Sequence, residues 1–245
     1  MKKIYMILVL AMVLFLQSCG MIVIEEDTNE YRLLSDQYNA YIMHDVVSFD
    51  DFKDIMNDAT NQTTLSVFML EKETFNRFNS VTDRKYGTAT LIYFDQNYLY
   101  LLTTFEMIDL NSQYINYYVH DAYGTEYEGE IYAADSSYSL GIIRVERTGV
   151  YYPKAKLADY LPLTNEMVLM ISNDHPSQNI HRLGYYLNQN DQSYVEMISS
   201  MNANGSPVFN LQLELIGIQY LYGDAYILLI DYQTIYTFVS DLLPI

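Results

Sequence analysis

The sequence has a single cysteine, no tryptophan and few basic residues. With one cysteine among 245 residues, no disulfide can form within the chain, so the apolar core must stabilise the fold alone. Lys and Arg number 13 against 31 Asp and Glu, which gives a net charge of −18 at pH 7. Binding of nucleic acid, or of anionic lipid through charge, requires clustered basic side chains. The composition therefore argues against both kinds of partner.

The chain begins MKKIYMILVLAMVLFLQSCG, which has the pattern of a secretory signal peptide. Two lysines precede an apolar run, Ile4–Leu16, that is too short to span a bilayer as a stable helix. The ending LQSC resembles the lipobox of bacterial lipoproteins, where the cysteine after the cleavage site is lipidated. The resemblance implies a signal peptide over residues 1–18 and a lipid anchor on Cys19, outside the cytoplasm on a bacterial membrane. An ordinary secretion signal and a short N-terminal membrane helix are the alternatives.

The remaining chain divides into a spacer and a folded domain. Residues 19–47 are polar and acidic with little periodicity, and we expect them to separate the domain from the lipid. Loss of Lys2 and Lys3 with the signal peptide would change the net charge from −18 to −20. Residues 48–245 should form the domain, beginning with a short helix that Ser48 can cap over FDDFKDIMNDAT.

The domain itself is expected to be all-β. From residue 62 the sequence consists of about a dozen short runs rich in β-branched and aromatic residues, separated by turn segments such as DQN and NQND. The closing stretch, DYQTIYTFVSDLL, has apolar residues at helical spacing and predicts a C-terminal helix. No EF-hand spacing, His-rich cluster or phosphate-binding glycine loop is present, so we expect neither a metal nor a cofactor.

Three segments of this domain carry motifs that are informative together. They are GTATLIYFDQNYLYLLTTFEMID at residues 87–109, DSSYSLGIIRVE at 135–146 and NANGSPVFNLQLELIGI at 202–218. In this order they resemble the histidine, aspartate and serine segments of trypsin-like serine proteases of the HtrA (Do-like) type. The resemblance implies two six-stranded β-barrels with an active-site cleft between them. In that family the first barrel supplies the histidine and aspartate, and the second supplies the serine.

All three catalytic positions are substituted in this chain. The histidine position holds Glu106, the aspartate position Ser139, and the serine position Asn204. Serine protease chemistry requires a hydroxyl nucleophile, an imidazole base and a carboxylate that orients the imidazole. A carboxylate is a poor proton acceptor at neutral pH, and a carboxamide cannot attack a peptide carbonyl. One expectation is that these three side chains hydrogen-bond to one another and fill the abandoned site.

The loop around the serine position has also diverged. It consists of Asn202, Ala203, Asn204 and Gly205, and if its turn survives, its amides could form an oxyanion-binding nest in the cleft. Ser206 carries the nearest hydroxyl, but it directly precedes Pro207. We therefore expect it to lie beyond the turn that would present a nucleophile. The four histidines lie outside the segment that supplies the family's base; they are His44, His120, His175 and His181.

The sequence therefore predicts a membrane-anchored lipoprotein that carries a catalytically inactive trypsin-like domain. Its partner would be a peptide or protein bound in the cleft, where an extended segment can lie beside a strand. Two alternatives remain open. One is an active trypsin-like serine endopeptidase with a non-standard site, and the other is a passive envelope or adhesion lipoprotein in which the cleft has no role.

Overall fold

A computed structural model describes residues 57, 60–110, 114–173, 179–190, 192–223 and 225–244. The predicted signal peptide, Cys19 and the spacer lie outside the described residues, as does most of the helix predicted from Ser48. Asn57 and residues 60–64 are helical, which places the end of that predicted helix. The described residues all belong to one compact unit, Ser48–Ile245. Among them, no helix combines the length and apolar character needed to cross a membrane.

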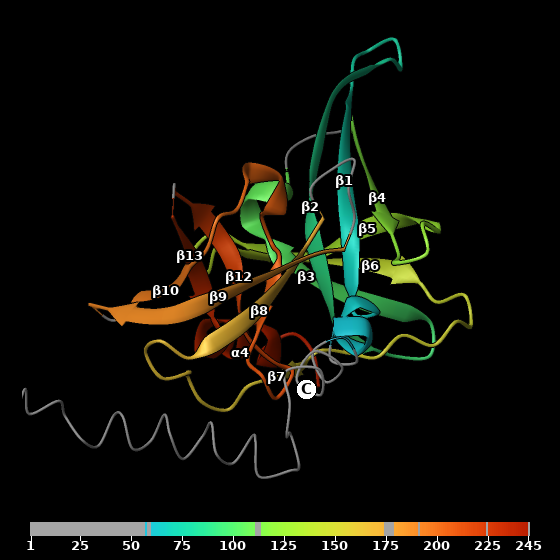
Figure 1. The fold of residues 1–245 in the computed structure, drawn as a ribbon. Coiled ribbons are helices and arrows are strands. Elements are labelled where there is room, and N and C mark those ends of the chain that lie inside the picture. The colour runs from blue at the N-terminus through green and yellow to red at the C-terminus, as the bar shows by residue number, and fades with distance from the viewer. Residues whose placement is uncertain are drawn as a thin grey trace, which may run out of the picture. The chain divides into compact units, whose positions relative to one another are not determined.

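The first half of this unit is a closed antiparallel barrel of six strands in the order β1-β2-β3-β6-β5-β4 (Figure 1). Its strands are β1 Val67–Phe75, β2 Val81–Phe94, β3 Tyr98–Thr104, β4 Ile115–His120, β5 Glu126–Asp135 and β6 Leu140–Glu146. A 3-10 helix, η1 Phe105–Met107, follows β3. The hairpin of β1 and β2 extends well beyond the rest of the barrel, because β2 is 14 residues long.

The second half is another closed barrel, in the order β11-β8-β9-β10-β13-β12, which the pairing of β11 with β12 completes. Its strands are β8 Met167–Ser172, β9 Ile180–Gln189, β10 Gln192–Glu196, β11 Pro207–Phe209, β12 Glu214–Tyr222 and β13 Tyr226–Asp231. A short strand, β7 Lys156–Leu157, pairs parallel to β12. A second 3-10 helix, η2 Met201–Ala203, precedes β11, and the C-terminal helix is α4 Tyr232–Ser240. The predicted all-β double barrel with a C-terminal helix is confirmed.

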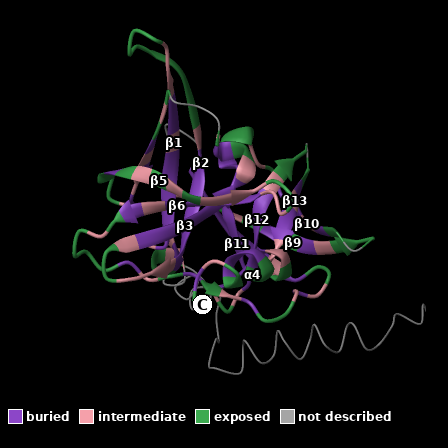
Figure 2. Ribbon diagram, turned by 180° about the vertical axis from the view of Figure 1, so that it is seen from behind, coloured by how far each residue is buried: buried purple, intermediate pink, exposed green. Residues whose placement is uncertain are grey.

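Three apolar cores explain the uninterrupted hydrophobic runs of the sequence. One core fills each barrel, and a third lies between the barrels and under α4. In β3, Leu101 faces the core of the first barrel, whereas Leu102 faces the core between the barrels. In β8, Met170 and Ile171 divide in the same way between the second barrel and the shared core. Because both faces of these strands are buried, they lack polar alternation, and the middle of the unit is almost wholly buried (Figure 2).

Candidate functional site

Glu106 lies where the first barrel meets the second, in the 3-10 helix η1 directly after β3. Its neighbour Met107 is buried and anchors the turn, while the Glu106 side chain is exposed. The backbone amide of Phe105 donates a hydrogen bond of 2.8 Å to the carbonyl of Ser139. Ser139 therefore adjoins the Glu106 turn through its backbone. Its φ of 57° places it in the left-handed region, just before β6 begins.

Asn204 ends the second 3-10 helix, η2, and Gly205 follows it with a φ of 81°. Only glycine fits at this point, for two reasons. The positive φ is strained for residues with a side chain, and a Cβ on Gly205 would lie 2.3 Å from the carbonyl oxygen of Thr88 on β2. Thr88 also contacts the preceding residue of the loop, because its amide donates a 2.8 Å hydrogen bond to the carbonyl of Asn204. The loop is thus pressed against the first barrel.

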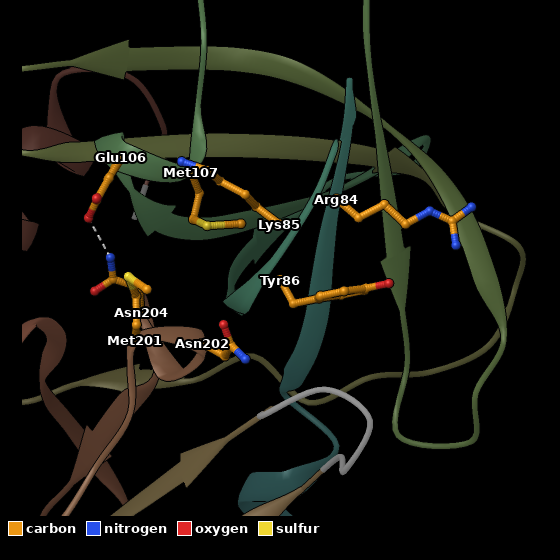
Figure 3. Close-up of a pocket in the computed structure, with 8 residues that line it drawn as sticks. All are labelled: Arg84, Lys85, Tyr86, Glu106, Met107, Met201, Asn202 and Asn204. Atoms are coloured by element: carbon orange, nitrogen blue, oxygen red, sulfur yellow. Dashed lines mark hydrogen bonds between the residues drawn. The ribbon is translucent and has the colours of Figure 1, made fainter. Parts of the chain in front are cut away.

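The structure brings Glu106 and Asn204 together. Nδ2 of Asn204 donates a hydrogen bond of 2.6 Å to Oε2 of Glu106, which joins the two barrels across the site (Figure 3). Asn204 is 6% exposed, so its amide is held firmly while the carboxylate reaches solvent. Among the described residues, the Ser139 hydroxyl makes no side-chain hydrogen bond to either of them. Two of the three predicted site residues therefore interact directly, and the third contributes backbone only.

The amides of the loop are largely used within the loop itself. Those of Ala203, Asn204, Gly205 and Ser206 donate to the carbonyls of Ser200, Met201, Gln219 and Ala203, at 3.2, 3.2, 2.9 and 3.0 Å respectively. An oxyanion hole needs amides that point at the ligand oxygen. In this conformation the Asn204 amide instead closes the η2 turn by donating to the carbonyl of Met201.

Ser206 cannot act as a nucleophile in this arrangement. It is fully buried, and its Oγ donates a hydrogen bond of 3.0 Å to Oγ1 of Thr88. The described histidines also lie elsewhere. His120 approaches Glu71 at 3.4 Å, and His181 lies 2.9 Å from the Thr64 hydroxyl, with burial lowering the pKa of its imidazole. His44 and His175 are outside the described residues.

A pocket of about 210 Å³ opens beside the Glu106–Asn204 pair. Its walls come from β2 and η1 of the first barrel and from residues 201–204 of the second half, and the lining residues are Arg84, Lys85, Tyr86, Glu106, Met107, Met201, Asn202 and Asn204 (Figure 3). The sequence predicted Glu106, Asn202 and Asn204 at this site but not the other five residues, because nothing in their pattern distinguishes them from ordinary strand and turn residues.

Only one of the two basic residues at the pocket is free of ion pairs with described side chains. The Arg84 guanidinium points away from the hollow and pairs with Glu73 at 2.5 Å and Glu71 at 3.4 Å, which raises its pKa (Figure 3). Lys85 is the other basic residue that lines the pocket. Across the ladder Lys85 is opposite Lys72, whose pKa is lowered by burial despite the nearby Asp109.

The fold is consistent with the trypsin-like double-barrel class, since both six-stranded antiparallel barrels are present and the pocket lies between them. No protein-family model matches the chain, and no curated protein is significantly similar to it in sequence. Within the described ranges, no group of three His, Cys, Asp or Glu side chains is placed to hold a metal ion. The site thus offers hydrogen-bonding and charged groups together with apolar walls.

Proposed function

We propose that the protein is a membrane-anchored lipoprotein whose trypsin-like domain, of the HtrA type, binds a peptide or protein and does not hydrolyse it. The lipid on Cys19 would hold the domain on the outer side of a bacterial membrane, as the LQSC ending implies. The observation that carries the proposal is the 2.6 Å hydrogen bond between Asn204 and Glu106. The two residues hold the positions that the resemblance assigns to the catalytic serine and histidine, and neither offers the hydroxyl nucleophile or the imidazole base of that mechanism.

Two further features support binding over catalysis. The nearest serine, Ser206, is buried and bonded to Thr88, so it has no access to a substrate. The pocket beside the pair remains open and is lined by both barrels, so the loss of the triad has not closed the site. Of these two features, only the open pocket favours a binding protein over a passive envelope protein.

The proposal is tested by treating the full-length protein with a fluorophosphonate probe, with an active serine protease treated in parallel. Fluorophosphonates label activated serines covalently, so we expect a mass shift for the control enzyme and none for this protein. Covalent labelling at any serine would overturn the proposal in favour of an active protease with a non-standard site. Mapping the labelled peptide would then show whether Ser206 had become exposed.

A further inference from the structure

The pocket presents an acidic group with unused hydrogen-bonding capacity. Glu106 accepts one hydrogen bond, from Asn204 to Oε2, and among the described side chains no donor reaches its second oxygen, Oε1. The site therefore offers a charged oxygen acceptor, which suits a ligand that donates N–H bonds.

The walls of the pocket suit a long side chain with a charged end. Met107 is 4% exposed and Met201 is 63% exposed, so one thioether lines the pocket from the protein interior and the other from the solvent side. Tyr86 is half-buried and supplies an aromatic ring. Methionine and tyrosine pack well against methylene chains, and an aromatic face also attracts cations. The net charge of −18 adds a long-range field that favours a basic ligand over an acidic one.

We propose that this pocket binds a basic side chain, a lysine or arginine of the peptide or protein ligand, with Glu106 accepting from its cationic head. The inference rests on the proposed function and specifies the ligand class of that same site. Met107, Met201 and Tyr86 contact the aliphatic stem. Lys85 is the one unpaired cation among the described pocket residues, and it acts against the ligand's charge. Lys85 therefore limits the affinity, and its removal should strengthen binding.

The test measures binding of three fluorescein-labelled, capped pentapeptides of alanine to the full-length protein by fluorescence anisotropy. The central residue is lysine, norleucine or glutamate. Norleucine keeps the stem of lysine without its ammonium group. We expect the lysine peptide to bind about tenfold more tightly than the norleucine peptide, because only lysine can donate a charge-assisted hydrogen bond to Glu106, and the glutamate peptide to bind most weakly.

Matched variants locate the preference. Glu106→Gln should bring the lysine peptide to within about twofold of norleucine, whereas Glu128→Gln, the same change on exposed β5, should leave it intact. Lys85→Gln should tighten the lysine peptide roughly threefold. Asn202→Trp, which fills the pocket from its exposed rim, should abolish binding of all three peptides, and circular dichroism checks that this variant folds.

Opposite results would overturn the inference in distinguishable ways. Tighter binding of the glutamate peptide, or a loss of affinity in Lys85→Gln, would mean that Lys85 recognises an anionic ligand. Equal binding of all three peptides, abolished by Asn202→Trp, would remove the cation preference and leave the proposed peptide-binding function standing. Binding of none of them would count against both.

Discussion

Two carboxylates of the first barrel, Asp121 and Glu106, differ in burial and in the number of hydrogen bonds that they accept. Asp121, in the turn after β4, is 2% exposed. It accepts from the Tyr152 hydroxyl at 2.7 Å and from the amides of Tyr123 and Thr125 at 2.9 and 2.8 Å. The Tyr127 hydroxyl lies 2.7 Å from that of Tyr152 and completes the cluster. Because the Tyr127 hydroxyl also donates to Asp121, at 3.4 Å, the acceptor sites of this carboxylate are filled.

Glu106 is the opposite case, because it is exposed and accepts a single bond, from Asn204. A saturated, buried carboxylate stabilises the fold, since removing it leaves several donors without a partner. An exposed carboxylate beside a hollow contributes little to stability, and its free oxygen is available to a ligand. The comparison indicates that saturation of its hydrogen bonds, more than charge alone, separates a structural acid from a binding one.

The largest expected effect is the loss of folding stability when the buried carboxylate of Asp121 is removed. Asp121→Ala should lower the free energy of unfolding by about 3 kcal/mol, because it leaves the Tyr152 hydroxyl and two turn amides without their acceptor in a buried site. Urea unfolding followed by circular dichroism measures the change. As a control, Glu128→Ala removes an exposed carboxylate of β5 and should cost at most about 0.5 kcal/mol. Equal losses in the two variants would mean that the cluster does not stabilise the barrel.

The pH dependence of stability should also reflect the hydrogen bonds to Asp121. Burial raises the pKa of Asp121, but the hydrogen bonds from Tyr152, Thr125 and Tyr123 outweigh it and hold the pKa below its ordinary value. A carboxyl whose pKa is lowered on folding contributes stability that is complete above its unfolded pKa, near 4, and is lost as the pH falls through the folded value. Stability should therefore fall below about pH 4. Asp121→Asn should flatten this part of the profile, and an unchanged slope would contradict the assignment.

The sequence predicted the framework of the site better than its contents. Glu106 and Asn204 are assigned to the site through the resemblance of their segments to the protease motifs, with Gly205 as an anchor, and the contact with Thr88 explains why that glycine is required. The three β2 residues of the pocket, Arg84, Lys85 and Tyr86, could not be predicted from the sequence. They look like any exposed end of a strand, and nothing in the sequence shows which loop packs beside that end. The loss of the Asn204 amide to the η2 turn was equally hidden, since it depends on backbone angles and not on residue type.

The smallest expected effect is on the stability of the pocket pair itself. Glu106→Gln should change the free energy of unfolding by at most about 0.5 kcal/mol, because a glutamine oxygen can still accept from Nδ2 of Asn204 and the side chain is exposed. Urea unfolding of Glu106→Gln and Asp121→Ala under the same conditions allows their losses of free energy of unfolding to be compared. A loss as large as that of Asp121→Ala would make Glu106 a structural acid that clamps the barrels. A small loss, combined with weaker binding of the lysine peptide, separates the function of Glu106 from the fold.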